Sequence, residues 1–228
     1  GFNMRKTGFI GLLCLALMLF ALAALFASAD ENDDISGKEA LRLLLEGNLR
    51  YVSGNITHSG QNLVDRRSEL IAGQHPFAVV VGCSDSRIPP EIIFDQGLGD
   101  IFVVRTAGQV LDNASLGSIE YAVEHLEVPL VVVLGHDDCG AVTAAVEGGE
   151  APCHMKCLVE SIRPAVDEAI KMGNDSELLD NAINNNIMNI KKELEGTNCI
   201  LSEGIQKGEL AIVAARYHID TGVVRIIG

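Results

Sequence analysis

The chain alternates between short apolar runs and longer stretches with helical spacing. The apolar runs are rich in β-branched residues and lie at 77–82, 101–104, 130–134, 210–214 and 223–227. Continuous runs of this length are typical of strands that are buried on both faces of a sheet. The helical stretches between them indicate crossovers that join parallel strands. The pattern therefore predicts an α/β fold with a mostly parallel central sheet flanked by helices.

The segment before the first strand predicts an N-terminal helical arm. Ser36 and Glu39 have the spacing of a capping box, and leucines then recur at helical intervals. These signals predict an amphipathic helix over residues 37–51. A second short helix is expected near 62–72, ending at Gly73 in a left-handed cap.

The C-terminal part predicts helices followed by an edge strand. Residues 155–208 are mostly helical in pattern, with a break expected at Pro164 and a polar face at the asparagine-rich segment 181–189. The last apolar run, 223–227, follows a tight turn at 220–222. We expect it to pair antiparallel at an edge of the sheet.

The first 29 residues differ from the rest and predict a signal peptide at 1–29. A short basic start precedes an apolar stretch at 8–26 and the small residues 27–29, a pattern typical of an export signal with its cleavage site. The apolar stretch of about 20 residues could also span a bilayer, so an uncleaved N-terminal membrane anchor is the alternative. Either interpretation places a single domain at 30–228 in an exported compartment, which we expect to be the periplasm.

The charge balance narrows the class of partner. The 228 residues include 17 Lys and Arg against 31 Asp and Glu, a formal net charge of −14. An average field of this sign repels nucleic acid, so we expect no nucleic-acid partner. A small-molecule substrate needs only local positive charge and is compatible with this composition.

Two predicted strand ends carry residues that can bind a metal ion. Cys83 follows the first strand, whereas His136 and Cys139 follow the third. Ligands gather at the carboxyl ends of parallel strands, so these two loops can converge on one point. Two thiolates and one imidazole favour zinc (Zn2+) over calcium or magnesium. Each residue alone is a weak signal, but together they predict a zinc centre.

The spacing of these residues resembles that of a known family. Cys-Ser-Asp-Ser-Arg at 83–87, followed about fifty residues later by Gly-His-x-x-Cys-Gly at 135–140, resembles the β-carbonic anhydrase family. The similarity extends over residues 36–228 and includes Ala-Arg-Tyr-x-x-Asp-Thr-Gly at 215–222. It implies the mostly parallel fold predicted above and one catalytic domain.

The resemblance implies a reaction and the residues that hold the metal. Zinc would be bound by Cys83, His136 and Cys139, with Asp85 and water sharing the fourth position. Zinc-bound hydroxide would attack carbon dioxide and give bicarbonate and a proton, and the reaction would be reversible.

Asp85 and Arg87 stand two residues apart on one loop and can form a bidentate ion pair. Such a pair would pull the carboxylate away from the metal and keep the fourth position open. Asp85 could then accept a hydrogen bond from the nucleophile and orient it toward the substrate. We therefore expect Asp85 and Arg87 to be catalytic residues.

Three further positions match family residues that bind substrate. Gln74 matches a side-chain amide that donates to a substrate oxygen, and Phe102 and Tyr121 match residues that line the apolar pocket. In this family the pocket often lies across a dimer interface, so the resemblance implies a homodimer or homotetramer. Contact with a membrane is expected only if the N-terminal segment is not cleaved.

Within the domain expected at 30–228, three cysteines lie outside the family pattern. Cys153 and Cys157 stand four apart near the start of a helix, so they could form a disulfide in an oxidising compartment, with Cys199 as another possible partner. A second metal site that includes His154 is a weaker alternative, because adjacent side chains on a helix point in different directions.

Two other functions are compatible with the same residues. The same zinc chemistry could hydrolyse carbon disulfide or carbonyl sulfide, since these are also linear heterocumulenes. Alternatively, Asp85 could close the site permanently and make it a non-catalytic structural zinc module. Arg87 and Gln74 argue against the structural module, because a structural metal needs neither residue.

Overall fold

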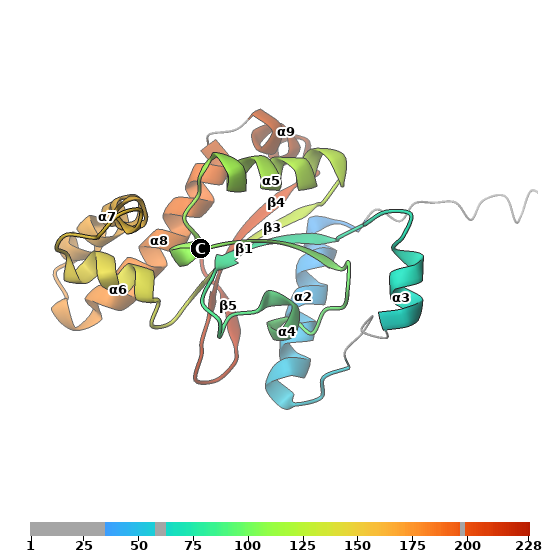
Figure 1. Cartoon of the computed structure of the whole chain (residues 1–228), viewed down its shortest axis with the longest axis horizontal. Coiled ribbons are helices and arrows are strands. Elements are labelled where there is room, and N and C mark those ends of the chain that lie inside the picture. The colour runs from blue at the N-terminus through green and yellow to red at the C-terminus, as the bar shows by residue number, and fades with distance from the viewer. Residues whose placement is uncertain (1–34, 58–62, 197–198) are drawn as a thin grey trace, which may run out of the picture. The chain divides into compact units, whose positions relative to one another are not determined.

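The computed structural model describes residues 35–57, 63–196 and 199–228 (Figure 1). Residues 35–228 form one compact unit. The signal peptide or anchor predicted at 1–29 lies outside the described residues. Within the described ranges, no helix has both the length and the apolar character needed to cross a membrane.

The described residues form a five-stranded sheet in the order β2-β1-β3-β4-β5. The first three neighbouring pairs are parallel, and β4 and β5 are antiparallel. This arrangement confirms the predicted fold class, including the antiparallel edge strand. The strands are β1 (Ala78–Cys83), β2 (Ile101–Thr106), β3 (Leu130–His136), β4 (Ala211–Tyr217) and β5 (Val224–Ile226).

Helices cover both faces of the sheet (Figure 1). One apolar cluster joins one face to α5, α6, α7, α8 and α9, and a second joins the opposite face to α2 and α4. The helices are α2 (Gly37–Ser53), α3 (Leu63–Glu69), α4 (Pro90–Ile93), α5 (Asn113–His125), α6 (Gly140–Glu147), α7 (Met155–Lys171), α8 (Leu178–Gly196) and α9 (Cys199–Lys207), with short 3₁₀ helices η1 (Ala107–Gln109) and η2 (Asp175–Glu177).

The central strands are buried on both faces, as their apolar runs predict. Every residue of β1 and β3 is buried. In β1, Val79 and Val81 belong to the cluster on one face, whereas Ala78 and Val80 belong to the cluster on the other. Each fully buried valine contributes roughly 1.5–3 kcal/mol. The parallel pairing of these two strands, with Gly82 opposite Leu134, places their carboxyl ends side by side.

The helical arm forms where the capping signal predicts it. The Ser36 hydroxyl accepts a hydrogen bond from the Glu39 N–H, and α2 ends at Ser53 and is capped by Gly54, which has a left-handed φ of 72°. The second helix was predicted to extend to residue 72, but α3 ends earlier, at Glu69. Gly73 is not its left-handed cap; its N–H instead closes a turn onto the Leu70 carbonyl.

The predicted break at Pro164 is wrong. Helix α7 runs through Pro164, which is exposed, while Ile162, Ala165 and Val166 form part of its buried face. A proline ring on the outer side costs one backbone hydrogen bond but leaves the apolar face intact, so packing maintains the helix. The polar face predicted at 181–189 needs correction too, because Asn186 is only 3% exposed.

Candidate metal centre

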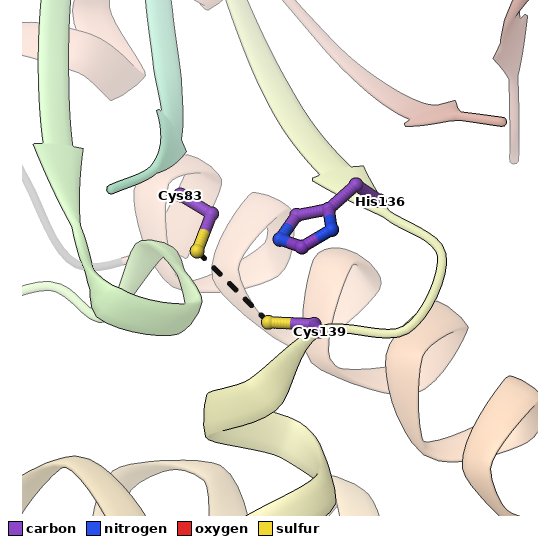
Figure 2. A group of neighbouring side chains, drawn as sticks. All are labelled: Cys83, His136 and Cys139. Carbon is purple, nitrogen blue, oxygen red and sulfur yellow. Dashed lines mark hydrogen bonds between the residues drawn. The ribbon is translucent and has the colours of Figure 1, made fainter. Parts of the chain in front are cut away.

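Three side chains meet at the carboxyl ends of two neighbouring parallel strands. Cys83 is the last residue of β1 and His136 the last residue of β3, while Cys139 precedes the first residue of α6. One ligand atom from each lies within 4.8 Å of the others. Figure 2 shows the imidazole ring of His136 beside the line that joins the two sulfur atoms. The structure therefore brings together the three predicted metal ligands.

The group is shielded from solvent and its cysteines are not cross-linked. Cys83 is 4% exposed, Cys139 1% and His136 0%. The two sulfur atoms are 4.0 Å apart, which is far beyond a disulfide bond, and both cysteines are free. Buried sulfurs at this separation suit joint coordination of one metal ion.

The hydrogen bonds of His136 leave one nitrogen for a metal. Nδ1 lies 2.7 Å from the Asp137 carbonyl oxygen, so Nδ1 carries the proton and donates. The other nitrogen, Nε2, is buried and has no hydrogen-bond partner. A buried nitrogen without a partner is costly, and metal coordination would satisfy it. The donor set and this orphaned atom both fit a bound cation.

The two thiols and the imidazole influence one another's pKa values. The hydrogen bond with Cys139 lowers the pKa of Cys83, and the backbone N–H groups of Asp85 and Gly108 act in the same direction. The same bond raises the pKa of Cys139. Burial lowers the pKa of His136, but the nearby Cys83 sulfur and the bond to the Asp137 carbonyl outweigh burial and leave it raised. A divalent cation would supply the positive charge that stabilises both thiolates.

Asp85 is turned toward Arg87, as the sequence predicts. Arg87 Nε donates to Asp85 Oδ1 over 3.0 Å, and Nη2 donates to Oδ2 over 2.8 Å. These bonds lower the pKa of Asp85 to about 2, so its carboxylate is ionised at neutral pH. Among the described residues, no carboxylate oxygen joins the three converging ligand atoms.

Arg105 supports this loop and was not predicted to have a role. It lies on β2 and donates from Nε to the Cys83 carbonyl (2.8 Å) and from Nη2 to the Asp85 carbonyl (2.6 Å). These bonds fix the backbone that carries both side chains. The available signal was a cationic residue inside an otherwise apolar strand, which is unusual unless its charge is satisfied.

Two of the predicted substrate-binding residues lie away from the metal ligands of the same chain. Gln74 and Tyr121 line a hollow of about 900 Å³ together with His125, whose ring centroid is 5.3 Å from that of Tyr121. Gln74 precedes β1, whereas Cys83 ends it, and a six-residue strand spans about 17 Å. Phe102 lies near the start of the edge strand β2, half-buried, and does not line this hollow.

Cys153 and Cys157, which lie outside the site, are exposed and unpaired. Cys153 and Cys157 are both free, and the Cys157 thiol donates to the His154 carbonyl over 2.8 Å. The disulfide considered for this pair is therefore not formed, and the side chain of Cys199 lies outside what the structure describes. In the described part of the chain, the metal-binding group is the one around Cys83, and no second group forms at His154.

The known proteins that this chain resembles in sequence and structure include several carbonic anhydrases. A family model described as carbonic anhydrase matches residues 78–224. Carbonic anhydrase 2 of Mycobacterium tuberculosis is 48% identical over 187 residues, which cover 80% of this chain and 89% of that protein. A carbonic anhydrase of Mycolicibacterium smegmatis is 44% identical over 191 residues, covering 82% and 91%. A tetrameric β-carbonic anhydrase of the ascomycete Sordaria macrospora superposes with a TM-score of 0.67 at 26% identity, covering 81% and 94%.

Proposed function

Because the chain belongs to the β-carbonic anhydrase family, we propose that Cys83, His136 and Cys139 bind one zinc ion for the reversible hydration of carbon dioxide. The products would be bicarbonate and a proton. The observation that carries this proposal is the buried Nε2 of His136, which lies close to two sulfurs and has no hydrogen-bond partner.

The donor set supports zinc and a catalytic centre. Two thiolates and an imidazole are soft and borderline ligands, which zinc prefers over magnesium or calcium. A zinc ion held there would lower the pKa of a water ligand and so supply a nucleophile near neutral pH. Structural zinc sites have four protein ligands, whereas three converge here among the described residues. This count argues against a purely structural module.

Asp85 and Arg87 would prepare the site for this nucleophile. The guanidinium group holds both carboxylate oxygens of Asp85, and Arg105 holds its carbonyl. The carboxylate is ionised and fixed in direction, so it can accept a hydrogen bond from the attacking group. It is also kept from acting as a fourth ligand. We therefore propose that Asp85 orients the reacting group and that Arg87 positions Asp85.

We propose that two subunits build each substrate pocket. Gln74 and Tyr121 are separated from the metal ligands of their own chain by the length of β1, so they would reach the centre of a second copy. Tyr121 is 46% exposed and Leu98, in the same hollow, is 43% exposed, which suits a surface that a partner covers. The tetrameric relative from Sordaria macrospora supports a homo-oligomer.

Replacing a ligand tests the metal assignment. We expect Cys83→Ala to lose bound zinc and carbon dioxide hydration together, measured by elemental analysis and stopped-flow assay. Cys157→Ala is the matched control, because this exposed cysteine lies outside the group, and it should retain both. A folded Cys83→Ala protein that hydrates carbon dioxide at the normal rate would overturn the proposal.

A further inference from the structure

Helix α8 lies next to α6 and β3 and carries the asparagine-rich segment. Two of its asparagines begin hydrogen-bond chains that end at two different metal ligands. We infer that Asn186 and Asn184 of α8 are positioning residues that set the geometry of Cys83 and His136 for zinc. This inference rests on the zinc binding proposed above and extends it to residues outside the ligand loops.

The first chain runs from Asn186 to Cys83. Asn186 is 3% exposed, and its Nδ2 donates to the Gly108 carbonyl over 3.0 Å. The Gly108 N–H in turn donates to Cys83 Sγ over 3.2 Å. The chain therefore joins α8 to the sulfur through the turn that follows β2.

The position of Gly108 leaves this link little freedom. Gly108 has φ 66° and ψ 21°, and a Cβ there would lie 2.8 Å from Ile162 Cδ1. A residue with a side chain would be both strained and crowded. Asn186 fixes the carbonyl of the same residue whose N–H points at the sulfur, so its bond determines how Gly108 is presented to Cys83.

The second chain runs from Asn184 to His136 through a buried arginine. Arg216 Nη1 donates to Asn184 Oδ1 over 3.1 Å, and Nη2 pairs with Asp180 on the same helix. Arg216 Nε donates to Asp137 Oδ1 over 2.6 Å. The Asp137 carbonyl accepts from His136 Nδ1 over 2.7 Å. Helix α8 therefore anchors the peptide that fixes the imidazole.

These bonds act on the ligands in ways that metal binding requires. A bond from N–H to sulfur stabilises the thiolate and fixes its direction. A bond from Nδ1–H to a carbonyl fixes the tautomer, so that Nε2 presents its lone pair. Partners of this kind typically contribute about 10- to 100-fold to metal affinity. Since Cys83 and His136 come from different strands, one helix that holds both also sets their separation.

Other asparagines of α8 serve a different purpose and provide a control. Asn185 donates to the Ala165 carbonyl, and Asn189 donates to Glu168, both on α7. These bonds join two helices and do not lead to the metal group. If the asparagines served only to pack α8 against its neighbours, replacing Asn189 and replacing Asn184 would change the zinc affinity equally.

The test compares Asn186→Ala and Asn184→Ala with Asn189→Ala in the full domain. Zinc affinity is measured by chelator competition, and the thiolate-to-metal absorption band is recorded after loading with cobalt(II). We expect Asn186→Ala to weaken zinc binding about 10- to 100-fold and to shift the band. Asn184→Ala should weaken binding about 10-fold, and Asn189→Ala should match the wild type in both measurements.

The outcomes separate this inference from the proposed function. Wild-type protein that binds no zinc would refute the proposed function itself. Wild-type protein that binds zinc, with folded Asn186→Ala and Asn184→Ala proteins of equal affinity and an unchanged band, would refute the positioning role alone. If Asn186→Ala does not fold, Asn184→Ala decides, because Asn184 is only half-buried and its loss leaves the Gly108 bond intact.

Discussion

At the level of single residues, the centre depends on where one carboxylate is held. Asp85 could act as a fourth ligand or as a hydrogen-bond acceptor for the nucleophile, and these roles exclude each other. Its two oxygens are engaged by Arg87, which is itself 49% exposed in its side chain. An exposed ion pair of this kind contributes little to the stability of the fold, so its main effect is to orient the Asp85 carboxylate.

Replacing Arg87 should separate metal binding from turnover. We expect Arg87→Ala to keep stoichiometric zinc and to lose about 10- to 100-fold in kcat, because Asp85 would no longer be held in the productive direction. Elemental analysis and stopped-flow hydration measure the two quantities. Arg163→Ala, which removes an arginine outside the site, should change neither. Normal turnover in Arg87→Ala would show that Asp85 needs no such partner.

At the level of helices and strands, a few buried polar contacts lock the layers together. Asn48 of α2 donates from Nδ2 to the carbonyls of Ile93 (3.1 Å) and Gly222 (2.9 Å), and its Oδ1 accepts from the Val224 N–H (2.9 Å). One side chain thus ties the helical arm to α4 and to the C-terminal hairpin. All three backbone groups would be left without this partner if Asn48 were removed.

We therefore expect Asn48→Ala to lower the free energy of unfolding by about 3 kcal/mol, since each buried unsatisfied group costs about 1–3 kcal/mol. Urea unfolding followed by circular dichroism measures the change. The control is Glu46→Ala on the exposed side of the same helix, which should stay within about 0.5 kcal/mol of the wild type. A loss in Asn48→Ala as small as in the control would contradict the locking role.

The cap of α5 should give a measurable pH dependence. Asp112 accepts a hydrogen bond from the Ser115 N–H over 2.7 Å, and this bond lowers the pKa of Asp112. A carboxyl whose pKa is lowered by folding stabilises the folded state at pH values above its ordinary, unfolded-state pKa near 4. That stability is lost as the pH falls through the folded-state pKa. Asp112→Asn keeps an acceptor oxygen but cannot titrate.

The difference in unfolding free energy between wild type and Asp112→Asn should therefore be constant above about pH 5 and shrink as the pH falls below about 4. Urea titrations at several pH values measure it. A difference that stays the same across this range would mean that the charge of Asp112 does not contribute to the cap.

At the level of the whole molecule, the fold keeps the metal group and the hollow apart. The metal group lies at the carboxyl ends of the strands, and the hollow lined by Gln74 and Tyr121 includes residues that precede β1. A two-fold symmetric dimer can bring the hollow of each subunit to the metal group of the other. Activity would then depend on association and not only on folding.

Mixing two inactive variants tests this arrangement. Cys83→Ala lacks a metal group but keeps the hollow, whereas Gln74→Ala keeps the metal group. After unfolding and joint refolding at equal amounts, half of the dimers are mixed, and each has one intact site if the sites are shared, so about a quarter of wild-type activity should return. No gain over the separate variants would show that Gln74 does not act on a partner subunit.

Local patterns accounted for much of the fold and for the metal ligands. Continuous apolar runs predicted β1 and β3, and the His-x-x-Cys spacing after a strand predicted that two ligands share one loop. The apolar character of a strand and the spacing of ligands within one loop are set by residues that are close in the chain, so both can be read from the amino-acid order. The signal peptide at 1–29 and export to the periplasm stay predictions. The mass of the mature protein would show whether the segment is cleaved, and cell fractionation would show where the protein lies.

Other features needed the folded chain. Pro164 sits on the outside of α7, a position that composition does not reveal, and packing of the opposite face overrides its helix-breaking tendency. The polar pattern at 181–189 did not show that Asn186 is buried and hydrogen-bonded to Gly108. Its partner Gly108 is 78 residues away, so only the tertiary structure could identify the pair.

The amino-acid order thus determined which strands are buried and which side chains can bind a metal ion, because the spacing of apolar residues and the chemistry of the ligands are local properties. The tertiary structure decided which distant groups support those atoms and that Gln74 and Tyr121 lie away from them. Strand order and helix packing set these distances, and they arise from contacts between segments far apart in the chain.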